Sequence, residues 1–550
     1  MKLRRATTIL TLTIFIVTVM SSCSGIGRKT VTIPTDIYSD ESYDINIVID
    51  FSDETKEISP YIYGVNQYGN EDNLDEANFA AIRQGGNRMT AYNWETNASN
   101  AGADWYHSSD SNLSDSDEPA DIVRTLSEEA KDNGITYKLT TLQMAGYVAA
   151  DKSGQVSEEN TAPSERFNEV IFRSDGEFPD TPDLTDGVVY MDEYVNYIIN
   201  MLGDSTSKNG IQGYSLDNEP ALWAGTHSRV HPDPVTIEEL CSKSAELAAV
   251  VKELDPSAEI FGPALYGYTA YDHLADDDDS TEWEELKEEN GYNWFLDCYL
   301  DYMCQASEEA GVRLLDVLDI HYYSESAGVS VEDRLQSVRT LYEEGFSENS
   351  WIGQRCMNNV PILPTIQASI DEYYPGTKLA ISEYNFGGEN ISGTIAEAEA
   401  LGCFADMGVY LATIWGGNDC QFAGIRLYTN YDGEGSMFGD TLISTTTDDV
   451  SLSSAYAATT DDGLVTLMST NKDSSLNENA IIDLTSSETI YTAAAVYAVY
   501  DEETYEIQLI NVVESTDTNV FEITLPPYCA AMVVLSEDVS DFPIVITDSE

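Results

Sequence analysis

Two glutamates stand directly behind short apolar segments, at the places where β-strands would end. Residues 213–216 (GYSL) are followed by Asp217-Asn218-Glu219-Pro220, and residues 378–382 (KLAIS) are followed by Glu383. Pro220 has no backbone N–H to donate to a sheet, so the first strand must stop before it. Two carboxyl groups at the carboxyl ends of barrel strands are the pair with which retaining glycosidases cleave a glycosidic bond. We therefore predict Glu219 as the general acid/base and Glu383 as the nucleophile.

Side chains suited to binding a sugar gather around these segments. Residues 83–94 (RQGGNRMTAYNW) leave an early strand, and the two glycines allow a tight bend before the amides and aromatic rings. Aromatic rings pack on the apolar C–H faces of pyranoses, while side-chain amides bind sugar hydroxyls. Asn218 lies beside the acid/base and is placed to bind a hydroxyl next to the bond that is cut. The predicted substrate-binding side chains in these segments are Asn87, Asn93, Trp94, Asn218 and Trp223.

Metal-dependent chemistry is the weaker interpretation of the polar clusters. His227 and His231 are four residues apart, a spacing that on one helix lets two imidazoles share a metal ion. Pro232 follows at once and no third ligand is evident, so His227 is predicted to form hydrogen bonds in the substrate cleft instead. The run Asp276, Asp277, Asp278 and Asp279 could hold calcium, although such runs are usually solvated loops. We expect no required cofactor, with structural calcium as the alternative.

Short apolar runs alternate with helix-like stretches between residues 59 and 415. Eight such strands interleaved with helices predict a (β/α)8 TIM-like barrel, an α/β fold in which functional side chains gather at the strand carboxyl ends. The predicted strands are residues 61–65, 80–84, 136–142, 213–216, 259–264, 314–322, 378–382 and 409–415. The clearest predicted helices are residues 117–132, 191–202, 236–253, 293–310 and 331–344.

The pattern changes near residue 451, where only short strands separated by turn residues remain. Residues 463–468, 493–500, 505–510 and 530–535 show no helical period, which predicts an antiparallel β-sandwich. Residues 43–50 alternate in the same way ahead of the barrel and could add a strand to that sandwich. The predicted organisation is thus an N-terminal strand segment at 44–58, the catalytic barrel at 59–450 and the C-terminal antiparallel β-sandwich domain at 451–540.

The first residues read as an export signal. Lys2, Arg4 and Arg5 precede an uncharged, largely apolar run that is too short to span a membrane. Met20-Ser21-Ser22-Cys23 then resembles a bacterial lipobox, which predicts a lipoprotein signal peptide at 1–22, lipidation of Cys23 and a polar tether at 23–43. The predicted location is the cell surface, with a lipid anchor as the only membrane attachment. Plain secretion is the alternative.

The net charge of the chain limits which polymers it can bind. The chain has 97 acidic and 26 basic residues, giving a formal net charge of −71 at pH 7. The resulting field repels nucleic acid and anionic polysaccharides, whereas a neutral polymer meets no such penalty. We therefore predict a neutral plant polysaccharide as substrate, no nucleic-acid partner, and a monomer.

Four separate segments, in order, resemble glycoside hydrolase family 44. They are residues 59–66 (SPYIYGVN), 85–104, 214–223 together with Thr226-His227, and 380–388. The resemblance extends over residues 43–536 and implies a retaining endo-β-1,4-glucanase, often active on xyloglucan, with a barrel and a β-sandwich. It also implies that Glu219 and Glu383 match the family's acid/base and nucleophile. By the same resemblance Trp351 and Trp415 line the sugar cleft, and Tyr323, at the end of the sixth strand, contributes to its wall.

The sequence thus predicts a retaining endo-β-1,4-glucanase that acts on β-glucan or xyloglucan through two glutamates. One alternative keeps the fold but changes the polymer to mannan or xylan, because the sequence does not determine which hydroxyls the cleft accepts. A second alternative is a non-catalytic surface glycan-binding lipoprotein. The presence of both glutamates argues against this second alternative, since a binding protein has no need of them.

Overall fold

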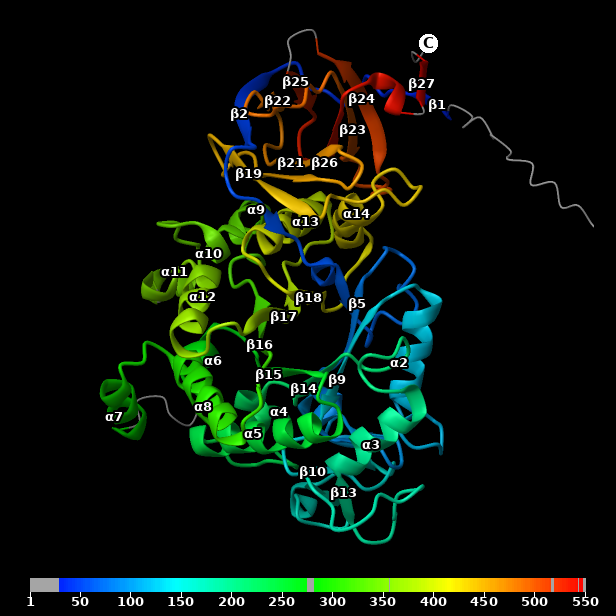
Figure 1. Ribbon diagram of the computed structural model, residues 1–550, viewed down its shortest axis with the longest axis vertical. Helices are drawn as coiled ribbons and strands as arrows, with labels where there is room; N and C mark the ends of the chain where they lie inside the picture. The colour runs from blue at the N-terminus through cyan, green and yellow to red at the C-terminus, as the bar shows by residue number, and fades with distance from the viewer. Residues whose placement is uncertain (1–28, 275–280, 356, 516–518, 543, 548–550) are drawn as a thin grey trace, which may run out of the picture.

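Eight parallel strands close into a barrel in the computed structural model (Figure 1), in the order β14-β15-β16-β17-β18-β4-β5-β9. The structure describes residues 29–274, 281–355, 357–515, 519–542 and 544–547. The barrel confirms the predicted fold, and its strands are β4 (Gly64–Asn66), β5 (Ala81–Gln84), β9 (Tyr137–Leu142), β14 (Gly213–Leu216), β15 (Glu259–Leu265), β16 (Val317–Tyr323), β17 (Lys378–Asn385) and β18 (Leu411–Ile414). Strands β5, β9, β14 and β18 are buried along their whole length because helices cover the barrel outside and side chains fill it inside.

Helices surround the barrel strands (Figure 1), mostly where the apolar periodicity predicts them. The longer ones are α2 (Asp121–Asp132), α3 (Met191–Leu202), α5 (Ile237–Leu254), α8 (Phe295–Ala310), α12 (Ile362–Tyr373), α13 (Ile391–Asp406) and α14 (Asp419–Thr429). Helix α5 begins where the Thr236 hydroxyl accepts a hydrogen bond from the backbone N–H of Glu239, a standard N-terminal cap. The helix predicted at 331–344 is divided into α9 (Val331–Ser337) and α10 (Arg339–Tyr342). At the division the Ser337 hydroxyl donates to the Arg334 carbonyl, and such a bond competes with the helical ladder.

Short elements fill the loops at the carboxyl ends of the strands. They include the helices α1 (Asn87–Thr90), α4 (Trp223–Thr226), α6 (Tyr268–Asp272), α7 (Thr281–Asn290) and α11 (Trp351–Arg355). Two small sheets in the loops after β5 and β9 are formed by β6 (Tyr92–Asn93), β7 (Ala98–Asn100), β8 (Ser108–Asp110) and β11 (Gly154–Gln155), and by β10 (Tyr147–Ala149), β12 (Phe167–Ile171) and β13 (Val188–Tyr190).

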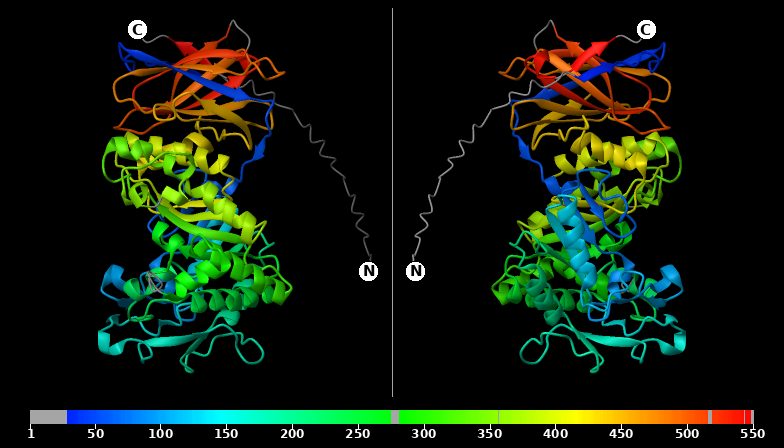
Figure 2. Two further views of the ribbon diagram at one scale, coloured as in Figure 1. Left: turned by 90° about the vertical axis from the view of Figure 1, so that its left-hand side faces the viewer. Right: turned by 90° about the vertical axis from the view of Figure 1, so that its right-hand side faces the viewer.

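A β-sandwich packs on one side of the barrel (Figure 2). One sheet has the order β24-β23-β26-β21-β20-β19 and continues through β19 into the second, β19-β2-β22-β25. The strands are β2 (Ser42–Asp50), β19 (Thr441–Thr447), β20 (Ala455–Thr459), β21 (Val465–Asn471), β22 (Asn477–Asp483), β23 (Ala493–Val499), β24 (Gln508–Glu514), β25 (Val520–Leu525) and β26 (Cys529–Ser536). Because β19 pairs with β20 and β2, the sandwich begins at Thr441 and not at the predicted boundary of 451.

The N-terminal segment crosses to the sandwich (Figure 1). Strand β2 inserts between β19 and β22, with Ile45, Ile47 and Ile49 facing the sandwich core. Its pairing with β22 is parallel, whereas the other strand pairs of the two described sheets are antiparallel. A short strand β3 (Lys56–Glu57) adds to β19 before the chain enters the barrel.

A two-stranded parallel sheet joins the two ends of the described chain. It pairs β1 (Lys29–Thr32) with β27 (Ile544–Thr547), so part of the segment predicted as a tether forms regular structure, and the chain continues beyond the predicted end of the sandwich at 540. The signal peptide, Cys23 and the run Asp276 to Asp279 lie outside the described residues. Among the described helices, none has the length and apolar character needed to cross a membrane.

A buried ion pair joins the sandwich to the barrel. Lys472, just after β21, lies 2.7 Å from Glu399 on α13, with both side chains at most 1 % exposed. The Tyr342 hydroxyl also donates to Glu399, at 3.0 Å, and the ammonium of Lys472 donates to the Val450 carbonyl. Loss of one partner would leave a buried charge uncompensated, at a cost of about 3–5 kcal/mol. The sandwich is thereby fixed to α13, the helix that follows the strand carrying Glu383.

A second buried carboxyl on α13 makes stability depend on pH. Glu397 is fully buried and accepts a hydrogen bond from the Tyr384 hydroxyl at 2.7 Å, and burial raises its pKa to about 8. The folded protein therefore keeps a proton between pH 4.5 and 8 that the unfolded chain releases, so this group's contribution to stability falls as pH rises through that window. Glu397→Gln should remove the effect and stabilise the protein at pH 8 by roughly 1–4 kcal/mol.

Calorimetric melting of this variant between pH 5 and 8 measures the effect. Exposed Glu246→Gln on α5 is the matched control and should melt in parallel with the unaltered protein. Some dependence on pH should persist in Glu397→Gln, because burial also raises the pKa values of Glu95 and Glu478 to about 8. An unchanged slope of melting temperature against pH would show that Glu397 does not titrate in this range.

Candidate active site

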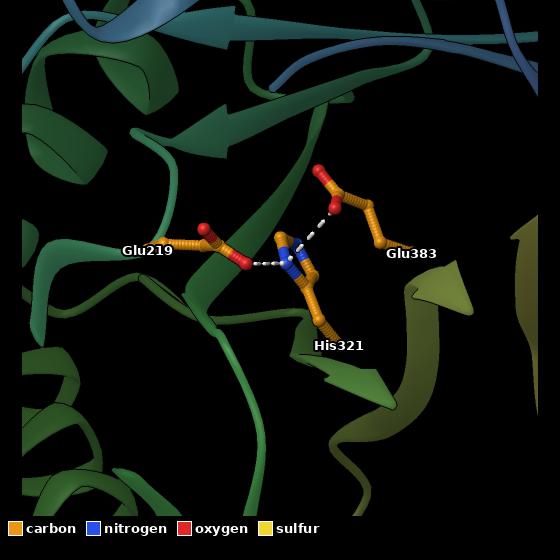
Figure 3. Close-up of side chains that lie close together, drawn as sticks. All are labelled: Glu219, His321 and Glu383. Carbon is orange, nitrogen blue, oxygen red and sulfur yellow. Dashed lines mark hydrogen bonds and ion pairs between the residues drawn. The ribbon is translucent and has the colours of Figure 1, made fainter. Parts of the chain in front are cut away.

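The two predicted glutamates lie together at the carboxyl ends of β14 and β17, with His321 of β16 between them (Figure 3). The Nδ1 atom of His321 is 2.9 Å from Oε1 of Glu219 and 3.5 Å from Oε2 of Glu383. One oxygen of each carboxyl group and a ring nitrogen of the histidine all lie within 4.8 Å of one another. The side chain of Glu219 is 13 % exposed and that of Glu383 is 6 % exposed, so the pair is reached from one side only.

Backbone conformation turns Glu219 into the site. Asp217 and Glu219 both have positive φ, 65° and 45°, a region that costs a non-glycine residue about 1–2 kcal/mol. The carboxyl group of Asp217 compensates by accepting hydrogen bonds from the Thr90 hydroxyl at 2.6 Å and the Asn218 N–H at 2.8 Å. It also accepts from the backbone N–H groups of Met144 and Ala145, in the loop after β9. These bonds tie the turn after β14 to neighbouring elements and orient Glu219.

Arg83 holds Glu383, the predicted nucleophile, in place. Its guanidinium, fully buried on β5, donates to Oε1 of Glu383 at 2.7 Å and to Oδ1 of Asn218 at 2.8 Å. A third hydrogen bond, at 3.0 Å, runs to Asn66 on β4. The other oxygen of Glu383, Oε2, accepts from the Tyr323 hydroxyl at 2.8 Å. Both oxygens of the nucleophile are thus held by donors from different strands.

The charges of the site follow from these contacts. Burial raises the pKa of Glu383, but the nearby His321 and Arg83 cations lower it by more than burial raises it. The net pKa therefore lies below the ordinary value. Burial lowers the pKa of His321, whereas the charges of Glu383 and Glu219 raise it, and the net pKa is raised. The arrangement therefore favours an ionised Glu383 next to a protonated imidazole.

Among the described residues, Glu219, His321 and Glu383 form the group close enough to hold a metal ion. The guanidinium of Arg83, 2.7 Å from Glu383, would repel such a cation. The predicted alternative at His227 and His231 fails for a geometric reason. His231 already uses Nδ1 with the Asp233 carbonyl and Nε2 with Glu239, so it has no nitrogen to share with His227.

A cavity of about 370 Å³ is lined by two of the predicted sugar-binding residues, Asn87 and Trp415, and we name it the active-site cavity because Asn87 contacts Asn218, the neighbour of Glu219. The ring of Trp415 lies 6.0 Å from that of Tyr68, which is 39 % exposed. Asn87 connects to the catalytic residues through the amide of Asn218, which donates to it at 3.4 Å. Trp105, at 60 % exposure, is also part of the lining.

Four predicted sugar-binding side chains are buried and cannot contact substrate in this structure. Trp94 stacks on Tyr194 at 5.3 Å, and Asn93 donates to the Ala149 carbonyl, so both belong to the packing of the loop after β5. Trp223 is fully buried and donates from its indole nitrogen to the Asn218 carbonyl, which makes it a support for the acid/base turn. His227 is 1 % exposed, and burial lowers its pKa to about 4.

Of the remaining predicted residues, Tyr323 and Asn218 contact the group around Glu383, whereas Trp351 lies on helix α11. Tyr323 contacts the nucleophile directly, and Asn218 is held by Arg83 and by the Gly86 N–H. Trp351 lies on α11, where its ring packs edge-on against Tyr268. Arg83 was missed as a site residue, although an arginine inside a predicted buried strand is itself a signal, because such a charge needs a partner. His321 lies two residues before Tyr323 on the same strand, and its contact with both glutamates is a tertiary feature.

The position of Trp415 in the wall of the active-site cavity requires a glycine at position 86. It has φ of +87°, and a Cβ atom there would lie 2.4 Å from the ring of Trp415. Gly86→Ala should displace this indole and lower kcat/KM on polymer by about 10-fold, equivalent to 1.4 kcal/mol. Gly134→Ala is the control, because Gly134 has φ of +73° but open space around it, and should cost stability alone. Equal kcat/KM for Gly86→Ala and the unaltered protein would contradict a role for Trp415 in binding.

An eight-stranded barrel that brings two carboxyl groups together, beside a cavity walled by aromatic rings and amides, defines a glycoside hydrolase. The sequence matches the profile of glycoside hydrolase family 44 over residues 98–326. It is 42 % identical to Endoglucanase A of Paenibacillus lautus over 536 residues, which cover 92 % of this chain and 75 % of that protein. The chain belongs to glycoside hydrolase family 44.

Solved structures agree with this assignment. Cel44A, a family 44 endoglucanase from Clostridium thermocellum, superposes with a TM-score of 0.85 at 46 % identity, covering 90 % of this chain and all of that one. A family 44 xyloglucanase from Paenibacillus polymyxa, whose structure was solved with xyloglucan, gives a TM-score of 0.85 at 41 % identity with the same coverage.

Proposed function

We propose that the protein is a retaining endo-β-1,4-glucanase that hydrolyses β-glucan or xyloglucan in two displacement steps. The observation that carries the proposal is the position of Glu383, ionised between Arg83 and Tyr323, with an oxygen of Glu219 within 4.8 Å. Retaining glycosidases have carboxyl groups about 5–5.5 Å apart, whereas inverting enzymes need about 6.5–9.5 Å to admit a water molecule. The endoglucanase and xyloglucanase activities of the similar proteins support the choice of substrate.

In the first step the Glu383 carboxylate attacks the anomeric carbon and forms a glycosyl ester. The bond from this carbon to the leaving oxygen breaks, and Glu219 donates its proton to that oxygen. Arg83 and Tyr323 keep Glu383 aimed, since both of its oxygens accept hydrogen bonds before substrate arrives. Tyr323 remains a donor throughout, because burial and the Glu383 charge raise its pKa far above the ordinary value.

In the second step water opens the ester. Glu219, now a carboxylate, takes a proton from water as the oxygen attacks the anomeric carbon, and Glu383 leaves as a carboxylate. The imidazole of His321 donates from Nδ1 to Glu219 and stabilises the ionised form needed here. Two displacements on the same carbon restore the β configuration.

Following the anomeric configuration of the first products by NMR tests this mechanism, with two neutral substrates, soluble xyloglucan and cellohexaose. We expect the β-anomer to appear first. Initial α-anomer would mean inversion, with Glu383 acting as a base on water. Mannan and xylan are tested as well, because the distance between the two carboxyl groups would be the same in an enzyme that cleaves either of these polymers. Binding to any of these polymers without product would support the non-catalytic glycan-binding alternative.

We propose further that the protein is an exported monomer, anchored through lipid on Cys23, that needs no cofactor. The net charge of −71 supports a neutral plant polysaccharide over any anionic partner. Cys23→Ser should move the protein from the membrane fraction to the medium, and sedimentation should give the mass of one chain. Full activity after chelator treatment would agree with the absence of a required metal, and a lowered melting temperature would indicate structural calcium.

A further inference from the structure

The active-site cavity does not end at Trp415. A second cavity of about 400 Å³ adjoins it, and Tyr68, Gly85 and Asn112 line both. Its far side is formed by one face of helix α2, through Ile122, Thr125 and Glu129, so we name it the α2 pocket. The shared lining makes the two cavities neighbours, so a ligand that fills the active-site cavity can continue toward α2. None of the three α2 residues that line this pocket takes part in the proposed mechanism.

A chain of hydrogen bonds pre-orients the polar wall of the α2 pocket. The Thr140 hydroxyl donates to Oε1 of Gln84, and Nε2 of Gln84 donates to Oε1 of Gln67 at 2.9 Å. Nε2 of Gln67 in turn donates to Oε2 of Glu129 at 2.6 Å. Gln84 uses both of its N–H groups, because it also donates to the Ile122 carbonyl. Gln67 keeps a second N–H donor and Glu129 a second acceptor oxygen, so these two groups can still bind a ligand. Their geometry is set before a ligand arrives, which lowers the entropy cost of binding.

The chemistry of the lining selects a neutral, hydroxyl-rich ligand. No lysine or arginine is among the lining residues described for the α2 pocket, whereas Glu71 and Glu129 are present, so an anion would be repelled. Met89, Ile122 and Leu113 supply an apolar surface opposite the amides. Apolar contact for ring C–H groups, together with amide and carboxylate groups for hydroxyls, is the combination that binds a pyranose. The exposed ring of Tyr68 stands at the junction, where it can stack on a sugar leaving the active-site cavity.

We propose that the α2 pocket binds a pyranosyl unit of the substrate that lies beyond the unit at Trp415, and that Glu129 and Gln67 determine which sugar fits there. This inference rests on the proposed function, because it assigns part of the same substrate. The unit can be a glucosyl residue of the main chain or a sugar attached as a branch. Both present pyranose C–H faces and hydroxyls to the pocket, and substrates with and without branches distinguish them.

Glu129→Ala tests the proposal through a comparison of long and short substrates. An aryl β-cellobioside is too short to fill both cavities, while cellohexaose and xyloglucan oligosaccharides are long enough. Glu129→Ala removes a hydrogen bond to a charged group, which weakens binding by at least about 10-fold. We therefore expect kcat/KM on the long substrates to fall at least 10-fold further than on the aryl cellobioside, mainly through KM. Glu128→Ala is the matched control, since this neighbour on α2 is exposed and pairs with Arg124.

The pattern of losses identifies the bound sugar. Equal loss on cellohexaose and xyloglucan oligosaccharides assigns a main-chain glucosyl unit, and loss on xyloglucan alone assigns a branch sugar. Equal losses on short and long substrates, or no loss on any, would overturn the proposal. If Glu129→Ala does not fold, Thr125→Trp fills the same pocket from α2 and should give the same pattern.

A failure of the proposed function can be distinguished from a failure of the α2-pocket proposal. In that case the unaltered protein would release no product from any of these substrates. Calorimetric titration of Glu383→Gln with the same oligosaccharides then tests the α2 pocket alone. Weaker binding of the long ligands by the Glu129→Ala, Glu383→Gln double variant would retain the pocket assignment, and unchanged binding would reject it.

Discussion

Replacing Glu383 by glutamine should lower turnover of xyloglucan by about 10⁴-fold or more while leaving the fold intact. An amide cannot attack the anomeric carbon, so the glycosyl ester does not form. Glutamine has nearly the same shape as glutamate, and its single carbonyl oxygen can still accept from Arg83 while its NH2 group faces the Tyr323 hydroxyl. The buried guanidinium of Arg83 loses its charge partner, so a lower melting temperature is expected for a variant that still folds. Initial rates of reducing-end release, measured beside the melting curve, provide the test.

Glu389→Gln is the matched control, because this exposed glutamate lies just beyond the same strand. A truncated variant adds a positive test. In Glu383→Ala, azide can enter the space of the lost carboxylate and attack from its side, and an activated substrate should then give the α-glycosyl azide. Residual activity of Glu383→Gln above about 1 %, with no inverted azide product from Glu383→Ala, would remove Glu383 from the nucleophile role.

Replacing Glu219 by glutamine should have an effect that depends on the leaving group. General acid catalysis contributes about 10²–10⁴-fold when a sugar alkoxide must be protonated, so polymer hydrolysis should fall by that factor. A dinitrophenolate leaves without protonation, and formation of the glycosyl ester from a dinitrophenyl cellobioside should therefore be little affected. The ester should accumulate, because no base remains to activate water in the second step. A pre-steady-state burst of dinitrophenolate measures this directly.

Azide again separates the roles of the two glutamates. In Glu219→Ala it attacks the ester from the acid/base side, and the expected product is the β-glycosyl azide. Glu158→Gln, an exposed glutamate at the protein surface, serves as control. An equal loss on polymer and on the dinitrophenyl substrate, without a burst, would mean that Glu219 supports the site but does not transfer the proton.

The backbone conformation that places Glu219 in the site costs free energy, and other contacts must compensate for it. Positive φ at both Asp217 and Glu219 opposes folding, and the turn persists because Asp217 is anchored to the loops after β5 and β9 and accepts a hydrogen bond within the turn itself. The indole of Trp223 closes the turn from behind through its hydrogen bond to the Asn218 carbonyl. Residues that appear suited to sugar binding in the sequence therefore serve to hold the acid/base in place.

Several features of this protein are determined by local sequence. The eight apolar runs give the barrel strands, because burial on both faces needs continuous apolar residues, and Pro220 prevents the strand β14 from continuing past the turn that carries Glu219. The Gly85-Gly86 pair marks a close approach, since a side chain at either position would collide with Arg83 or Trp415. Because all barrel strands are parallel, residues at their carboxyl ends must meet, and this alone brings Glu219 and Glu383 to one face.

Other features were decided only by tertiary structure. Whether an indole binds sugar or packs in the core depends on which surface covers it, so Trp94 and Trp223 are buried while Trp105 and Trp415 line the active-site cavity. The partners of Glu383 come from strands 60 to 300 residues away in the chain, and no local pattern specifies such contacts. The charges of the site are equally non-local, because a pKa is set by burial and by neighbours in space. Sequence thus determined the reacting groups, and packing determined their orientation, their ionisation and the surface that the substrate meets.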